Sequence, residues 1–413
     1  MQKLLFFITI FGVVIFLSCH KESPNEPPQV TIQPQVDIPW PSLANSPWPM
    51  FHHDPQSTGR SQYPGPRKGK IKWTFKPGGA IYSAVVIGTD STIYFPCEGI
   101  GLYALYPNGN LKWKLSLPLA SDHQPLVAAD GTIFLVTGPS FDSHNLNSLY
   151  AINPDGSIKN RFDFDFAPWS SLNIGIDGTL YLTSVSGPQL YAVSQQGTIL
   201  WSFSLPNGGW GAQNITISPD GKILYLFDYV SAYRITGLYA VGIDGQLQWH
   251  YSIEDDQTTL HSSLVDSDGN IYFGTFGISD SCGFYSISST GRLNWKYDGL
   301  IQPEPTMDLK GHLFFDLALG ECKLTSIDFQ GNLRWQTILE DGANLAAYIC
   351  DHEGFIYHCA ANSVNAYDSN GNLLWHVPFV DAKATRIACP AIGYDGTLYV
   401  GTRAGDSRLY AIE

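Results

Sequence analysis

The sequence predicts an all-β fold, an eight-bladed β-propeller of four-stranded antiparallel blades, because three short patterns recur in phase along it. The first is a Gly-containing turn followed four residues later by Trp, as in GNLKW at Trp113. The second is a turn that leads into a strand, as in DGTIFL and DGTLYL, and the third is a strand of the type LYAL or LYAV. Each pattern occurs eight times, at a spacing of roughly 40 to 48 residues that is typical of propeller or solenoid units.

The second unit shows the four strands that we expect in each blade, over residues 124–129, 132–137, 148–153 and 157–162. Asp-Gly and Asn-Gly pairs join the first strand to the second and the third to the fourth, because short hairpin loops need positive φ. Four antiparallel strands per unit indicate a propeller blade. The two kinds of short turn lie on one face of the ring, and the longer, uneven connections lie on the other, where binding is expected.

The two ends of the repeat region predict how the ring closes. GKIKWTFK, residues 69–76, has the pattern of a fourth strand with no blade before it, and the chain finishes on LYAIE, a third strand with no fourth strand after it. We therefore expect residues 71–75 to pair with residues 409–412 in one shared blade. This pairing covers two sheet edges that would otherwise promote aggregation.

The Trp of each turn is predicted to pack against the neighbouring blade and to stabilise the ring. Truncation of a buried Trp to Ala typically costs about 3 to 5 kcal/mol. One slot, GSIKN, has Asn160 where Trp is expected. The predicted docking residues are Trp73, Trp113, Trp201, Trp249, Trp295, Trp335 and Trp375.

The N-terminal residues predict export and a membrane anchor. Lys3 precedes the apolar run LLFFITIFGVVIFL, which ends at Ser18-Cys19, and residues 1–18 resemble a lipoprotein-type signal peptide that leaves Cys19 as the lipid attachment site. An uncleaved anchor or a plain secretory signal are the alternatives. The cell envelope, and most simply the outer membrane, is the expected location, with the periplasmic or surface side left open.

Three further segments follow this signal. Residues 19–47 are rich in Pro, Gln and Asn and are predicted to form a disordered tether. Residues 48–68 form a lead-in segment that packs on the propeller, so that the HHD triplet at 52–54 has a packing role. The propeller itself is expected over residues 69–413.

Charge and cysteine content limit the partners and bonds of the chain. Its formal net charge of -14 would repel a phosphate backbone, so nucleic acid is excluded as a partner. Cys97, Cys282, Cys322, Cys350, Cys359 and Cys389 show no adjacent pair and no CxxC spacing, so free thiols are expected. The body is predicted to be monomeric.

Alignment of the innermost strands places a set of polar and aromatic residues at the mouth of the central channel and in the loops beside it. His123, His261 and Glu304 could bind a metal, but they come from distant blades, so a hydrated polar mouth and no metal site are expected. The aromatic residues could stack on a sugar or a quinone, or close the channel as a lid. The candidate binding face comprises Tyr82, His123, Gln124, Trp169, Trp210, Gln213, Asn214, His261, Glu304 and Arg386.

The LYA strand, the Gly turn and the GxxxW pattern resemble the pyrroloquinoline-quinone (PQQ)-like repeat of a β-propeller family. WPMFHHDPQSTGRS, residues 48–61, resembles the lead-in before the first strand of such propellers. In plan, the repeat and the N-terminal Cys are closest to the propeller lipoproteins of the outer-membrane barrel-assembly machinery. The resemblance predicts the fold well and the function much less well, because one fold carries many sites.

Three functions are compatible with this resemblance. The first is a non-catalytic, lipid-anchored scaffold with a protein partner on the loop face, including a role in outer-membrane protein assembly. The second is a binding module for glycans or other envelope polymers. The third is a quinoprotein dehydrogenase, but the resemblance implies an adjacent Cys-Cys pair in such enzymes and the sequence has none. We therefore predict no catalytic residues and no cofactor, PQQ included.

Overall fold

The computed structural model divides into two compact units, Met1–Val30 and Thr31–Glu413. The described residues all fall in the second unit, namely 33–117, 123–138, 147–185, 187–206, 208, 210–211, 214–229, 235, 237–253, 257–258, 263–277, 282–318, 321–339, 348–360, 362–379, 389–403 and 407–413. The predicted signal peptide, Cys19 and the first part of the predicted tether lie outside them. None of the described residues belongs to a helix long and apolar enough to cross a membrane.

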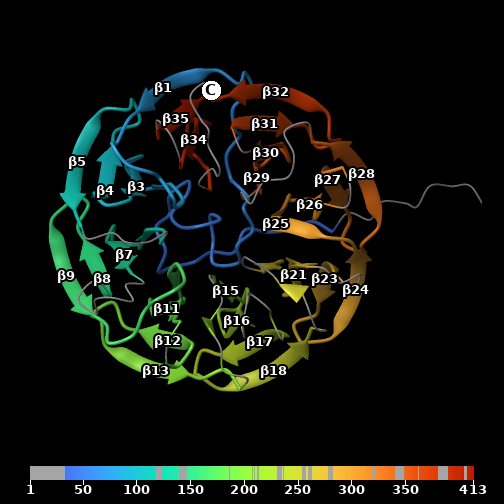
Figure 1. Ribbon diagram of the computed structural model, residues 1–413, viewed down its shortest axis with the longest axis horizontal. Coiled ribbons are helices and arrows are strands. Elements are labelled where there is room, and N and C mark those ends of the chain that lie inside the picture. The colour runs from blue at the N-terminus through green and yellow to red at the C-terminus, as the bar shows by residue number, and fades with distance from the viewer. Residues whose placement is uncertain are drawn as a thin grey trace, which may run out of the picture. The chain divides into compact units, whose positions relative to one another are not determined.

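Eight blades, each built on four antiparallel strands, surround a central axis in the second unit, as predicted (Figure 1). Blade 4 has a fifth, short strand, β14 (Trp210–Gly211), that also pairs with its second strand. The strands of each blade are given from the axis outward. Blade 1 contains β2 (Val86–Ile87), β3 (Ile93–Cys97), β4 (Gly101–Leu105) and β5 (Leu111–Ser116). Blade 2 contains β6 (Leu126–Val127), β7 (Ile133–Thr137), β8 (Ser148–Ile152) and β9 (Ile158–Asp163). Blade 3 contains β10 (Asn173–Ile174), β11 (Leu180–Thr183), β12 (Leu190–Val193) and β13 (Ile199–Phe203). Blade 4 contains β15 (Thr216–Ile217), β16 (Ile223–Tyr229), β17 (Gly237–Gly242) and β18 (Leu247–Ser252).

The second half of the ring repeats this plan. Blade 5 contains β20 (Leu264–Val265), β21 (Ile271–Gly274), β23 (Gly283–Ile287) and β24 (Leu293–Asp298). Blade 6 contains β25 (Ile301–Met307), β26 (Leu313–Leu317), β27 (Lys323–Ile327) and β28 (Leu333–Ile338). Blade 7 contains β29 (Tyr348–Cys350), β30 (Ile356–Cys359), β31 (Ser363–Tyr367) and β32 (Leu373–Pro378). Blade 8 contains β33 (Ala391–Ile392), β34 (Leu398–Gly401), β35 (Leu409–Ile412) and β1 (Ile71–Phe75).

The shared blade closes the ring in the predicted way. β1 pairs antiparallel with β35, with Phe75 opposite Leu409 and Ile71 opposite Ile412. The pairing continues one residue further, because the backbone N–H groups of Lys70 and Glu413 each donate to the other residue's carbonyl oxygen. The N-terminal strand therefore supplies the outer edge of the C-terminal blade.

Burial changes from the axis to the rim of each blade. In blade 1 every residue of β3 and β4 is buried, whereas every residue of β5 is exposed or half-buried. The inner strands are buried on both faces because neighbouring blades cover them, and the outer strand has one face in solvent. The core thus consists of the apolar layers between adjacent blades.

The docking of Trp residues repeats around the ring. Each indole N–H donates to a backbone carbonyl of the next blade at 2.8 to 3.2 Å. Six of these carbonyls lie at the turn between the third and fourth strands, and the seventh, which Trp375 contacts, belongs to Pro66 in the segment that leads into β1. The donors are Trp73, Trp113, Trp201, Trp249, Trp295, Trp335 and Trp375. A turn Gly lies directly under the ring: at Gly371, with φ of 83°, a Cβ atom would come within 2.5 Å of Trp335 Cε3. Only Gly combines this φ with this close approach.

In blade 2 another aromatic residue takes the place of the missing Trp. Asn160 occupies the Trp register opposite Ala151 and is exposed. Phe162 follows two residues later on the same face of β9 and packs on Gly197 of blade 3, where a Cβ would overlap with the Phe162 ring. Phe162 therefore fills the gap between blades 2 and 3, a role that the sequence pattern did not indicate.

The segment before β1 crosses the short-turn face in two layers. We call residues 48–61 the collar and residues 33–47 the strap. The collar runs around the axis, and its carbonyl oxygens accept backbone hydrogen bonds from six blades. The donors are Ile87, Val127, Ile217, Val265, Met307 and Cys350, and the acceptors, in the same order, are Trp48, Pro49, Pro55, Gln56, Thr58 and Gly59. These bonds satisfy backbone donors at the inner edges of the sheets. The first strand of blade 2, β6, has two residues and is shorter than the six residues expected.

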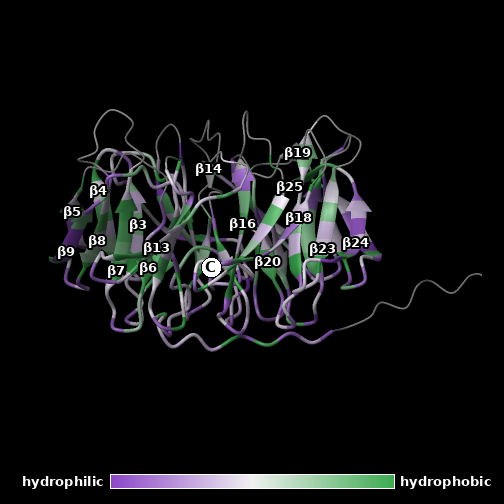
Figure 2. Cartoon of the chain, turned by 90° about the horizontal axis from the view of Figure 1, so that it is seen from below, coloured by the Kyte–Doolittle hydropathy of each residue, from purple (hydrophilic) through white to green (hydrophobic). Residues whose placement is uncertain are grey.

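The strap lies over the collar and along the short turns (Figure 2). Its Trp40 is 8% exposed and donates its indole N–H to the Ile174 carbonyl at 2.7 Å, and the Ala44 N–H donates to the Val127 carbonyl at 3.0 Å. Residues 33–47 are thus packed, unlike the disordered tether that their composition predicted. The reason is that Trp40 and Leu43 anchor a segment whose average polarity is high.

Candidate functional site

The predicted binding face is described only in part. Of its ten residues, Gln213, His261 and Arg386 lie outside the described residues, and Trp210 is described only through its backbone in β14 (Trp210–Gly211), which pairs with the end of β16. The other six can be placed. They are Tyr82, His123, Gln124, Trp169, Asn214 and Glu304.

Glu304 is the centre of a buried polar cluster in the channel. Asn214 Nδ2 donates to Glu304 Oε1 at 3.4 Å, so the structure brings together two predicted residues from blades 4 and 6. His52 Nε2 of the collar lies 3.3 Å from Glu304 Oε2, and both side chains are almost fully buried. The contact is close enough for an ion pair but is not aligned as a hydrogen bond.

His52 was assigned only a packing role from the sequence, and it has one. Its ring stacks on Phe51 at 4.8 Å, and its Nδ1 lies 3.2 Å from the Ser57 carbonyl oxygen. Its contact with Glu304 was not predicted, because no repeat relates the collar to the blades. The one available signal was the position of the HHD triplet in the lead-in segment before the first strand.

His123 lies near the mouth of the channel but does not join this cluster. Burial lowers the pKa of His123 to about 4, against a smaller opposite effect of a hydrogen bond with the Pro168 carbonyl. The imidazole is therefore neutral at physiological pH. Its Nε2 atom is buried and meets no hydrogen-bond partner within the described part of the chain.

The remaining described residues have local contacts. Arg403 lies over the ring of Tyr82 at 4.0 Å, a cation–π contact between the first and last blades. The Gln124 backbone N–H donates to Ser171 Oγ at 3.3 Å. Trp169 is half-buried, and its backbone N–H donates to the Thr183 carbonyl at 2.9 Å. Arg403 is a further residue of this face that the sequence analysis missed.

The described residues contain neither a metal-binding cluster nor a disulfide bond. Among the described residues, no group of three His, Cys, Asp or Glu side chains is placed to hold a metal ion. The six cysteines after Cys19 are free thiols, and only Cys322 is not fully buried. Cys389 illustrates their environment, because burial, with a further contribution from the Glu304 carboxylate, raises the pKa of its thiol well above the ordinary value.

A second buried acid, Asp316 of β26, lies between blades 6 and 7. The Tyr348 hydroxyl donates to Asp316 Oδ1, and the Tyr348 ring stacks on His358 at 4.8 Å. Burial raises the pKa of Asp316 well above its ordinary value, and the hydrogen bond from Tyr348 opposes this only in part. The folded protein therefore holds the proton on Asp316 more tightly than the unfolded chain does.

Asp316 should make the wild-type protein less stable as the pH rises, and Asp316→Asn should remove this contribution. Below the unfolded pKa of about 3.9 both states are protonated and Asp316 has no pH-dependent effect. Above it the unfolded chain releases the proton first, so wild-type stability falls by up to about 1.4 kcal/mol per pH unit until the raised pKa is passed. Urea unfolding from pH 4 to 8 should therefore show a shallower decline for Asp316→Asn. Asp298→Asn, at an exposed carboxylate, should keep the wild-type slope, and equal slopes for all three proteins would contradict the burial effect.

Comparison with known proteins agrees with the geometry. A family model described as "Outer membrane protein assembly factor BamB" matches residues 102–315, just over half of the chain. No curated protein matches the sequence. Among solved structures, BamB from Moraxella catarrhalis has a TM-score of 0.61 at 12% identity and covers 83% of this chain and 97% of its own. Quinohemoprotein alcohol dehydrogenase from Comamonas testosteroni has a TM-score of 0.67 at 11% identity, and the match covers 90% of this chain and 81% of the dehydrogenase. The Dos1 propeller has a TM-score of 0.62 at 10% identity, and the match covers 84% of this chain and 95% of that propeller. At these identities the solved structures indicate the fold alone.

Proposed function

This chain belongs to the family described as outer membrane protein assembly factor BamB, and from that membership we propose that it is a non-catalytic protein-interaction scaffold of the cell envelope. A lipid on Cys19 holds it at the outer membrane, and a protein partner binds its loop face. The partner belongs to the apparatus that assembles outer-membrane proteins. The family match is the observation that carries this proposal.

The channel supports a scaffold better than a quinone enzyme. Glu304 and Asn214 carry the carboxylate and amide oxygens that calcium prefers as ligands. However, Glu304 is already in contact with His52, and the stacked rings of Phe51 and His52 lie beside it. The sequence also lacks adjacent cysteines. The described residues therefore do not fit a PQQ cofactor, and we derive no reaction through one.

The loop face supports protein binding by its shape. The strap and collar cross the short-turn face, whereas β14 and the ribbon of β19 (Gln257–Thr258) with β22 (Phe276–Gly277) lie at the opposite edge of the ring (Figure 2). These short strands extend beyond the regular blades. A strand edge of this kind can pair with an extended segment of a partner, which gives affinity through main-chain hydrogen bonds.

Site-specific crosslinking tests the loop face. Glu98 is exposed at the turn between β3 and β4 on this face, and Gln196 is exposed at a short turn on the other face. Cells that carry Glu98→Cys or Gln196→Cys are treated with a thiol-reactive photocrosslinker, and the adducts are identified by mass spectrometry. We expect Glu98→Cys to capture a component of outer-membrane protein assembly and Gln196→Cys to capture none.

Two outcomes would contradict this assignment. Equal capture of that component from both positions would mean that the loop face is not the binding face. Capture of glycan or peptidoglycan alone from Glu98→Cys would instead favour a binding module for envelope polymers, in which Trp169 and its neighbouring loops hold the sugar.

A further inference from the structure

An open groove of about 570 Å³ lies on the short-turn face, between the strap and the collar. We call it the strap groove. One wall is formed by strap residues from Asp37 to Ser46, the floor by collar residues such as Pro49 and His53, and the rim by Thr89 and Ala129 of the first two blades. Its volume is in the range of small-ligand sites. Because it lies on the face opposite to the loops, it is independent of the scaffold proposal.

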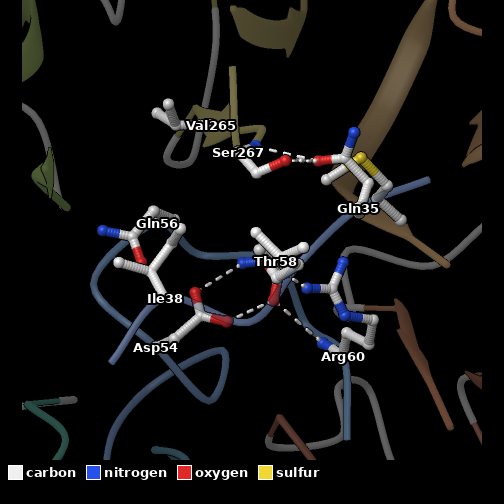
Figure 3. A pocket seen from close by; sticks show the side chains of 10 residues that line it. Gln35, Ile38, Asp54, Gln56, Thr58, Arg60, Val265 and Ser267 are labelled. Carbon is white, nitrogen blue, oxygen red and sulfur yellow. Dashed lines mark hydrogen bonds between the residues drawn. The ribbon is translucent and has the colours of Figure 1, made fainter. Parts of the chain in front are cut away.

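The strap wall is held in place by a buried charge. Arg60 of the collar is 2% exposed, and its Nη2 and Nε atoms donate to Asp37 Oδ1 at 2.7 and 3.2 Å. Gln35 adds a second tie, because its Oε1 accepts hydrogen bonds from the N–H and the hydroxyl of Ser267 in blade 5 (Figure 3). Displacement of the strap would leave the Arg60 charge buried and unpaired, which is costly. The groove is therefore a preformed feature of the fold.

The strap groove combines prolines, apolar side chains and carboxylates in its lining. Four of its residues are prolines, which have no N–H, and the carbonyl oxygens of Pro49 and Pro55 already accept backbone hydrogen bonds from Val127 and Ile217. The charged side chains among its described lining residues are the carboxylates of Asp37 and Asp54, and no Lys or Arg lines it. Arg60, behind the strap, balances the charge of Asp37, so Asp54 is the carboxylate that makes this lining negative. Ile38 and Leu43 contribute apolar surface. A ligand that donates hydrogen bonds and carries positive charge on an apolar stem complements these walls.

Asp54 keeps a negative charge at the floor of the groove. The Thr58 N–H donates to Asp54 Oδ1 at 3.0 Å, the Thr58 hydroxyl donates to Oδ2, and His53 Nδ1 lies 3.3 Å from Oδ2. Burial alone would raise the pKa of Asp54, but the contacts with His53 and Thr58 together hold it below the ordinary value. The carboxylate is therefore ionised throughout the physiological range.

We propose that the strap groove binds a guanidinium or alkylammonium group, supplied by the basic side chain of an extended peptide or by a free amine. Asp54 provides the negative charge, because the charge of Asp37 is balanced by Arg60, and the prolines and Leu43 pack on the stem. The acidic character of the whole chain, with its net charge of -14, adds to the attraction at low ionic strength.

Isothermal titration with two probes tests the proposal and distinguishes the sources. The probes are the capped peptide acetyl-Gly-Arg-Gly-amide and the free diamine cadaverine, with acetyl-Gly-Gln-Gly-amide as the neutral control. We expect the Arg peptide to bind and the Gln peptide not to bind. Binding of cadaverine as well would indicate that a free amine suffices, whereas binding of the peptide alone would identify a peptide segment as the ligand.

A charge exchange at the rim locates the site. Gln62 is exposed and lines the groove, so Gln62→Glu should tighten binding of the Arg peptide and Gln62→Lys should weaken it, each by about threefold or more. Thr198→Glu and Thr198→Lys make the same charge changes at an exposed turn residue of blade 3 outside the groove, and they should leave the dissociation constant within about twofold. Ala129→Trp, at an exposed rim position, should block the groove without altering the fold.

Three results would overturn the proposal. The first is the absence of binding up to about 5 mM Arg peptide. The second is equal binding of the Arg and Gln peptides. The third is an affinity that responds equally to charge at Gln62 and at Thr198, or that survives Ala129→Trp, since the bound cation would then lie elsewhere.

Discussion

Replacement of residues 70–76 by a Gly/Ser linker of equal length should open the ring and make the protein aggregate. The linker keeps the distance between the collar and blade 1, but it removes the strand that pairs with Leu409–Ile412. It also removes Trp73, whose indole N–H bonds to the Pro107 carbonyl of blade 1 at 3.0 Å. The freed edge of β35 can then pair with another molecule. Size-exclusion chromatography with light scattering should show oligomers, and thermal melting should shift down by more than about 10 °C.

A rescue variant separates this effect from a general loss of packing. The sequence of residues 70–76 can be appended after Glu413 through an Asn-Gly turn, the pair that joins the third and fourth strands of blades 1 and 7. This chain should be monomeric and should melt close to the wild type. A linker variant that stays monomeric with unchanged melting would show that β1 is dispensable for closure.

The sequence was sufficient for the ring because its information is repeated. Each blade carries the same turn, strand and Trp signals, so a weak signal in one unit, such as GSIKN at Asn160, is supported by the others. The half-blades at the two ends then determine both the number of blades and the pairing of β1 with β35. Hydrophobic alternation alone would have given strands but not their closure.

The strap and the collar were less predictable because they have no repeat. The composition of residues 33–47 predicted a disordered tether. Their fixed position depends on Trp40 and on the ion pair between Asp37 and Arg60, two residues that are 23 positions apart in the chain. Likewise, the contact of His52 with Glu304 joins the collar to blade 6. Such contacts depend on how the collar crosses the channel, and single-sequence patterns do not contain that path.

The sequence predicted which residues lie at the channel but not which of them contact one another. Alignment of the first strands placed Asn214 and Glu304 in the candidate binding face, and the structure has a hydrogen bond between them. The partner of Glu304 came from outside the repeat, and His123 is held apart as a neutral imidazole near the mouth. Register therefore predicts which residues face the channel, while their pairing depends on the segment that fills it.

Trp335→Ala and Phe162→Ala should each destabilise the ring by about 2 to 4 kcal/mol, whereas Asn160→Ala should cost less than about 0.5 kcal/mol. Trp335 packs on Gly371 of blade 7 and bonds to the Ser369 carbonyl at 3.0 Å, and Phe162 occupies the equivalent gap over Gly197. The expected loss for Trp335 is below that of a fully buried Trp, because its ring is half-buried. Asn160 is exposed although it holds the Trp register, so its side chain contributes little.

Urea unfolding followed by circular dichroism measures all three variants under one condition, and the ranking of the midpoints is the decisive result. If Phe162 replaces the missing Trp, Phe162→Ala should fall near Trp335→Ala and far from Asn160→Ala. A neutral Phe162→Ala would mean that blades 2 and 3 are held together by other contacts. Equal shifts for Asn160→Ala and Trp335→Ala would mean that position in the repeat, and not the aromatic contact with the next blade, determines the contribution to stability.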